Sequence, residues 1–124
     1  MNKAILITLT ALLLAGCAKQ TPAEFGRELG KEYVLKDDQA VCNAAGFYYW
    51  REQGDPRPGV RQEAAGVMDI LKRELVARNL KSDATCEMSM KNGAAEAKRL
   101  NAEAMEAQRR QTEQEQRKAR AASY

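Results

Sequence analysis

Almost all of the large apolar side chains lie in the first 90 residues of this 124-residue chain. After Met105, no large apolar residue occurs until Tyr124. A segment without such side chains cannot contribute to a hydrophobic core, although it can form a solvated helix or a fluctuating coil. The sequence therefore predicts a compact region of about 70 residues that carries the core, followed by a polar tail.

A separate apolar run occupies the N-terminus. The segment Ala4–Ala15 follows a single positive charge, Lys3, and contains 12 largely apolar residues. A membrane-spanning helix needs about 20 such residues, so this run is too short for a permanent transmembrane span. It is typical of a secretory signal peptide, which we place at residues 1–16.

The apolar run ends in Leu14-Ala15-Gly16-Cys17, which resembles the lipobox of bacterial lipoproteins. The resemblance implies cleavage between Gly16 and Cys17 and attachment of covalent lipid to the Cys17 thiol. Several acyl chains would anchor the protein durably, whereas one chain is marginal at about 0.8 kcal/mol per buried CH₂. The alternative is an ordinary signal peptide with an incidental cysteine near its cleavage site.

Ala18 follows the expected anchor, and residues 17–21 form a short linker. In lipoproteins of enteric-type bacteria, Asp at this place favours the inner membrane. Its absence here implies the outer membrane, with the protein on the periplasmic face. The inner membrane remains an alternative, because Lys19 could change the sorting in other bacteria.

Two further cysteines, Cys42 and Cys86, belong to the part of the chain that would be exported. The periplasm oxidises paired thiols, and two is the number that pairs without remainder once Cys17 carries lipid. We expect a Cys42–Cys86 disulfide, which would stabilise the fold by roughly 4 kcal/mol. The alternative, a redox pair of free thiols, lacks a Cys-x-x-Cys motif.

We expect residues 22–91 to form a small all-α domain, which would be a helical hairpin or bundle stapled by the disulfide. One helix is expected to begin at Pro22, where Gly26 and Gly30 should weaken it by about 1 kcal/mol each. Two further helices, over 39–53 and 60–79, should pack antiparallel around a rigid turn.

Residues 92–124 predict a charged, helical and partly disordered tail. A helical segment should begin after Asp83 and break at Asn92 and Gly93. Eight basic and five acidic residues follow Met90. The excess of basic residues could bind lipid headgroups, peptidoglycan carboxylates or an acidic partner. The alternative is a solvated tail that binds none of them. We expect no nucleic-acid partner for a lipidated periplasmic chain.

Four consecutive aromatic residues, Phe47-Tyr48-Tyr49-Trp50, fall within the second expected helix. If Cys42 faces the core, Tyr49 shares its side and Phe47 points away. Aromatic side chains concentrate in binding hot spots, so Phe47, Tyr48 and Trp50 are candidate partner contacts. Alternatively, the first helix packs over them.

The chain contains no His, which removes the Ser-His-Asp triad, the Cys-His dyad and His-ligated metal sites. The adjacent acids Asp37 and Asp38 are better explained as a helix cap than as a catalytic pair, since neighbours in sequence do not face one another. No metal-ligand spacing or phosphate-binding loop is present. We therefore expect a non-enzymatic protein with no cofactor except the lipid.

These features indicate a lipid-anchored cell-envelope protein that acts by binding another envelope protein. The run Cys42-Asn43-Ala44 is similar to a Cys-x-Asn-Ala element of lipoproteins that exclude a second conjugal plasmid, which implies plasmid or phage exclusion. The alternatives are a structural tether or spacer, and an inhibitor or accessory subunit of a cell-wall enzyme.

Overall fold

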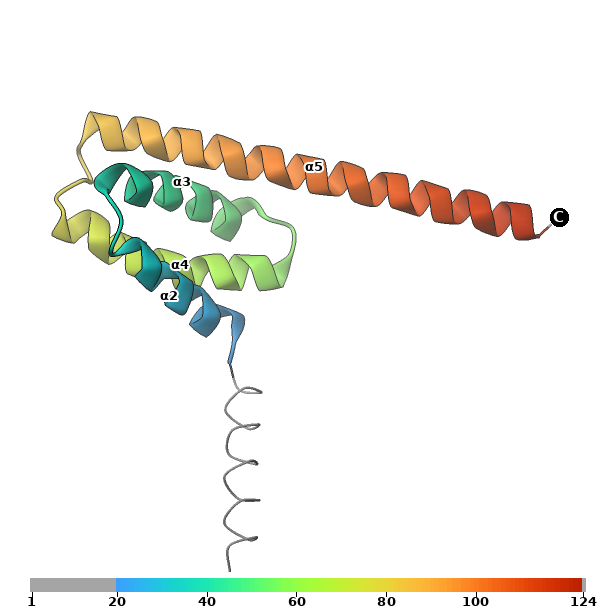
Figure 1. Ribbon diagram of the computed structural model, residues 1–124, viewed down its shortest axis with the longest axis horizontal. Helices are drawn as coiled ribbons and strands as arrows, with labels where there is room; N and C mark the ends of the chain where they lie inside the picture. Colours follow the sequence, from blue (N-terminus) through green and yellow to red (C-terminus); the bar gives the residue numbers. More distant parts are fainter. Residues whose placement is uncertain (1–19, 124) are drawn as a thin grey trace, which may run out of the picture.

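The computed structural model describes residues 20–123, which form an all-α fold as the sequence predicts (Figure 1). No strand occurs within this range. The expected signal peptide and lipid-attachment site, including Gly16 and Cys17, lie outside the described residues. The helices are α2 (Pro22–Tyr33), α3 (Asp38–Gly54), α4 (Pro58–Ala77) and α5 (Ala84–Ala122).

The helices contact one another in the spatial order α2, α4, α3, α5 (Figure 1). The pair α3 and α4 is antiparallel around the turn that joins them, as expected for helices connected by a few residues. Helix α5 runs in the same direction as α3 and continues past that turn. Helices α2 and α5 therefore lie on opposite sides of the central α3–α4 pair.

Three of the four helices begin at a side-chain cap. Thr21 accepts a hydrogen bond from the Glu24 backbone N–H (3.2 Å), and Glu24 accepts one from the backbone N–H of Thr21 (3.4 Å). Asp37 caps α3 and Asp83 caps α5, each by accepting a backbone N–H at 2.8 Å. Because a cap satisfies backbone donors that the helix leaves free, these short polar residues determine where the helices start.

The core lies where α3 contacts α4 and the first turns of α5. The expected disulfide is confirmed: Cys42 and Cys86 are bonded, with their Cα atoms 5.2 Å apart. Both are nearly inaccessible, so the bond belongs to the core rather than to the surface. The largest apolar side chains that are fully buried beside it are Leu71, Val41 and Val67.

Glycines allow α3 and α5 to approach closely. A Cβ atom on Gly46 would overlap the carbonyl oxygen of Met90, and one on Gly93 would overlap the carbonyl oxygen of Asn43. The expected helix break at Asn92 and Gly93 is therefore wrong: α5 is continuous, and Gly93 provides the space that a close backbone approach requires.

The same arrangement joins α2 to α4. A Cβ atom on Gly26 would overlap the carbonyl oxygen of Glu63, and one on Gly66 would overlap that of Ala23. The glycine that was expected only to weaken α2 is thus buried in its contact with α4. Packing accounts for a residue that helix propensity alone disfavours.

Packing of α5 against α3 extends beyond residue 91. Gly93 and Ala97 are buried, and Leu100 is half-buried. Residues 102–122, which we call the arm, are exposed except for the half-buried Glu106. The arm is helical rather than coiled, and at about 1.5 Å per residue it is roughly 32 Å long.

We predict that Gly46→Ala lowers the free energy of unfolding by about 1–3 kcal/mol, because the added methyl group overpacks the α3–α5 contact. Gly59→Ala is the matched control, since a Cβ atom there meets nothing within 4 Å. That variant should be neutral or about 0.4–1 kcal/mol more stable. Urea denaturation with the disulfide intact measures both, and equal stability of the two variants would contradict the role of Gly46.

Candidate functional site

The candidate functional features of residues 20–123 lie on open surfaces of the helices. Within residues 20–123, no group of three or more His, Cys, Asp or Glu side chains is arranged to hold a metal ion. No helix of that range is long and apolar enough to cross a membrane. The candidate features are the aromatic run on α3, two polar clusters at the helix connections, and the arm.

Phe47 and Tyr48 are half-buried on α3 and pack against each other. Their ring centroids are 5.1 Å apart in an edge-to-face arrangement. The Arg51 guanidinium lies over the Phe47 ring at 4.6 Å from its centroid. Edge-to-face aromatic pairs and cation–π contacts both add to the energy of area burial. Both rings therefore have a structural role within the chain and also present an edge to solvent.

Tyr48 also connects α3 to α2. Its ring lies 6.1 Å from that of Tyr33, again edge-to-face. Burial, and then hydrogen bonding with Tyr33, raise the pKa of Tyr48 above its usual range. Helix α2 thus reaches the aromatic run at Tyr48, as the alternative interpretation proposed. Besides α4, helix α3 also packs against α5.

Of the remaining two aromatic residues, Tyr49 differs from the helical-wheel expectation. Tyr49 was expected to share the core side with Cys42, yet it is 53% exposed. The reason is that α3 has neighbours on two sides, so a position between those sides remains open. Trp50 is half-buried and lies against Gly54, where an added Cβ would be 3.2 Å from the indole. The assignment of Phe47, Tyr48 and Trp50 as partner contacts stays a prediction.

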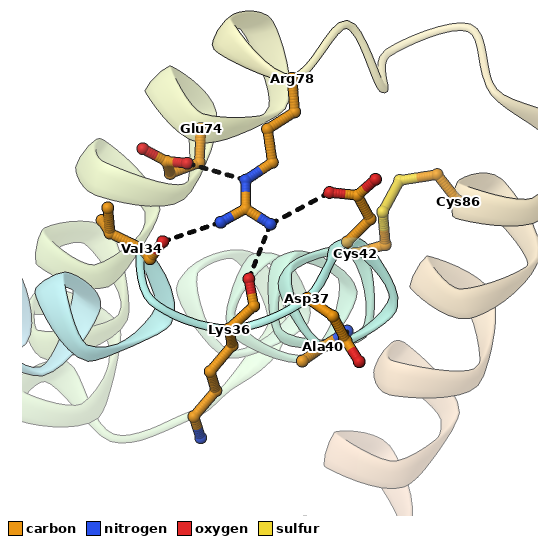
Figure 2. Close-up of polar contacts among 9 residues, drawn as sticks. Val34, Lys36, Asp37, Ala40, Cys42, Glu74, Arg78 and Cys86 are labelled. Atoms are coloured by element: carbon orange, nitrogen blue, oxygen red, sulfur yellow. Dashed lines mark hydrogen bonds and ion pairs between the residues drawn. A yellow bond between two sulfur atoms is a disulfide. The ribbon is translucent and has the colours of Figure 1, made fainter.

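Arg78 joins three elements near the disulfide (Figure 2). Its Nε donates to Glu74 at 2.9 Å, within α4. Its Nη atoms donate to the carbonyl oxygens of Val34 (2.9 Å) and Lys36 (2.8 Å), in the connection between α2 and α3, and Nη1 also donates to Asp38 (3.1 Å). The Glu74–Arg78 spacing of four residues indicates a surface ion pair, but it does not indicate the carbonyl contacts, which sequence reasoning missed.

Asp55 organises the turn between α3 and α4. It is 2% exposed, and its carboxylate accepts hydrogen bonds from the backbone N–H (2.9 Å) and guanidinium (3.0 Å) of Arg57. The guanidinium of Arg57 holds the pKa of the Asp55 carboxyl below its usual range. Arg61 donates to the Asp55 carbonyl oxygen at 2.8 Å. This carboxylate therefore has a structural explanation and is not a candidate catalytic acid.

The arm carries ion pairs within single helical turns. Arg109 pairs with Glu106 and Glu113, and Arg110 also pairs with Glu106. Such exposed pairs contribute only a few tenths of a kcal/mol each, but together they favour the helical form. At 100° per residue, these charges share one side of the helix. The opposite side continues the face that packs on α3. It presents Ala104, Gln108, Gln111 and Thr112, and then Glu115, Lys118 and Ala119.

We predict that Arg78→Lys lowers the melting temperature by several degrees, because one ammonium group cannot reach Glu74, Asp38 and two carbonyl oxygens at once. Arg73→Lys, on the exposed surface of the same helix, is the control and should change the melting temperature little. Thermal unfolding followed by circular dichroism compares them. A decrease of the same size in both variants would show that Arg78 does not hold the connection.

Comparison of the chain with protein-family models, with curated proteins and with solved structures gives no match. The features of this chain that bear most on function are the Leu14-Ala15-Gly16-Cys17 motif of the sequence and the arm of α5.

Proposed function

We propose that this protein is a lipid-anchored component of the bacterial cell envelope that binds another envelope protein through its arm. The observation that supports this proposal most is that about half of α5 extends past the bundle (Figure 1). The Leu14-Ala15-Gly16-Cys17 motif supports the anchor, and Ala18 supports the outer membrane with the protein facing the periplasm.

The two sides of the arm differ in a way that suits protein binding. One side holds the ion pairs, which keep charged groups partnered within the helix. Between Ala104 and Thr112 the other side carries small or neutral side chains, before Glu115 and Lys118 follow on it, and Met105 at its edge is 55% exposed. Over the stretch from Ala104 to Thr112, the helix face can approach a partner closely without burying an unpaired charge.

A structural spacer is the second candidate function, and the ion pairs of the arm favour it. A helix held by successive pairs such as Arg110–Glu106 and Arg109–Glu113 keeps its length in solvent. The two candidates make different demands. A binding arm depends on the identity of one face, whereas a spacer depends on length alone.

The run Cys42-Asn43-Ala44 is similar to an element of plasmid-exclusion lipoproteins. This similarity suggests that the protein and its partner act in plasmid or phage exclusion. We do not propose these residues as partner contacts. Cys42 and Ala44 are buried, and Asn43 donates to the Ser89 carbonyl oxygen at 3.5 Å. Their positions fit packing of α3.

We predict that Cys17→Ser abolishes incorporation of radiolabelled palmitate by the full chain in bacteria, because the thiol that accepts lipid is lost. The double variant Cys42→Ser with Cys86→Ser is the control and should keep its label, since those thiols pair with each other. Persistent labelling of Cys17→Ser would overturn the lipid anchor.

We predict that a photo-crosslinking residue in place of Gln108 forms one discrete adduct with an envelope protein in cells. Ala104→Glu should reduce the adduct about tenfold, because it places a charge on the neutral face. Ala102→Glu lies in the same turn on the charged side and should leave the yield unchanged.

Removal of residues 107–117 separates the spacer from the binding arm. These 11 residues make about three helical turns, so their removal shortens the arm and keeps the order of its faces. A phenotype caused by this deletion and by neither Ala104→Glu nor a change at Gln108, with no crosslinked adduct, would favour the spacer and contradict binding through the arm.

A further inference from the structure

We propose that the groove between the beginnings of α2 and α4 is a membrane-contact surface, with Phe25 placed in the boundary between lipid headgroups and acyl chains. The inference rests on the proposed lipid anchor at Cys17. It adds a second, non-covalent contact with the bilayer and specifies which side of the bundle faces the lipid.

The length of the connection restricts where the bundle can lie. Four residue steps separate Cys17 from Thr21, the cap of α2. At no more than about 3.6 Å per residue, they span at most about 14 Å. Because acyl chains on Cys17 would lie in the bilayer, the beginning of α2 would be held within that distance of the lipid surface.

The surface at this position is an open groove of about 530 Å³. Phe25 lies on one side of it and is 50% exposed, although its ring is among the largest apolar side chains of the chain. The other side is formed by Gly59 and Val60 at the beginning of α4. Arg57 and Glu63 also line the groove.

The chemistry of the groove fits the headgroup boundary. Aromatic side chains are favoured at that depth, where an apolar ring leaves water while nearby polar groups stay hydrated. The side chain of Arg57 is 53% exposed even though it pairs with Asp55, so part of the guanidinium still faces outward. A guanidinium beside an apolar surface can contact lipid phosphate while its stem lies against acyl chains.

The outer side of α2 explains why the contact is confined to the groove. Glu24, Glu28 and Glu32 recur every four residues and are all exposed. Lys31 pairs with Glu28 at 2.8 Å, and the remaining carboxylates of Glu24 and Glu32 would be repelled by an anionic membrane. Phe25 lies beside this row, so the bundle should tilt its groove, rather than the acidic side of α2, toward the lipid.

The position of the arm argues against a bilayer that covers the whole end of the bundle where α2 and α4 begin. The α3–α4 turn lies at that end, and the arm passes well beyond it (Figure 1). A bilayer across the turn would force charged residues such as Arg109 and Glu113 into hydrocarbon, which is strongly unfavourable. Contact through the α2 side avoids this, since α4 and α3 separate α2 from α5. The arm then remains in the aqueous phase, available to a protein partner.

The disulfide and the acylated cysteine make a direct test possible. With Cys17 blocked by lipid and Cys42 bonded to Cys86, an introduced cysteine is the one free thiol. The full lipidated chain carrying Phe25→Cys is labelled with an environment-sensitive fluorophore and placed in vesicles of phosphatidylethanolamine and phosphatidylglycerol. We expect a blue-shifted emission that brominated lipids quench at least threefold more than the emission of a control label.

Val76→Cys provides the matched control, because Val76 is 59% exposed near the opposite end of α4. Ala119→Cys reports the arm. Both labels should resemble a label in water. Gly59→Cys places the label on the other side of the groove, where an added Cβ meets nothing within 4 Å, and keeps Phe25 intact. It should behave as Phe25→Cys does.

If the labels at residues 25 and 59 are as accessible to water as the label at residue 76 in the lipidated protein, the membrane-contact surface is wrong while the anchor stands. If the wild-type chain incorporates no palmitate, the anchor itself is wrong, and the membrane-contact surface that depends on it is wrong as well. Equal quenching at residues 25 and 119 would contradict the orientation, because it would place the arm on the bilayer.

Discussion

The close approach of α3 and α5 is the contact on which the rest of the molecule depends. Gly46 and Gly93 each lie against a carbonyl oxygen of the other helix, and the Cys42–Cys86 bond joins the same pair about one turn from Gly46. Backbone contact this close tolerates no side chain at either glycine, so it restricts the register as well as the separation of the helices. Closing a loop between residues 44 positions apart also reduces the entropy of the unfolded chain, which contributes roughly 4 kcal/mol of stability. The direction of α5, and therefore the path of the arm, follows from this contact.

A second glycine contact, between α2 and α4, completes the order of the layers. Gly26 and Gly66 seat α2 on the side of α4 that faces away from α5. The consequence is functional as well as structural, because the chain enters the bundle at α2 and leaves it at α5. The proposed anchor at the N-terminus and the proposed interaction arm would thereby lie on opposite sides of the central helices. With the reverse order of layers, the charged arm would lie on the same side as the proposed anchor.

Polar clusters complete the helix connections without supplying chemistry. Arg78 bonds the two carbonyl oxygens of the α2–α3 connection, and Asp55 is saturated by Arg57. Buried or half-buried charges of this kind are costly unless they are partnered, and here their partners are within the chain. Part of the aromatic run is likewise in contact within the chain, since Phe47 packs against Tyr48 and Tyr48 packs against Tyr33. Surfaces of the described residues that stay open include the arm, Tyr49, the groove beside Phe25, and the exposed apolar side chains of Leu35, Val76 and Met88.

The sequence alone determined the starts of the three capped helices, the disulfide and the division into a core region and a polar C-terminal segment. These are local or compositional properties: Thr21, Asp37 and Asp83 cap the residues that follow them, and Cys42 and Cys86 have one way to pair once Cys17 is set aside. The motif ending in Cys17 likewise depends on adjacent residues. Only the tertiary structure decided that α5 continues through Gly93, that Gly26 lies in a helix contact, that Tyr49 is exposed and that Arg78 bonds the α2–α3 connection. The reason is that a glycine is interpreted as a helix breaker when its neighbours in space are unknown. Likewise, a helical wheel does not show how many sides of a helix other helices cover. Which face of the arm is free, and on which side of the bundle the chain enters at α2, depend on contacts between residues about 40 positions apart.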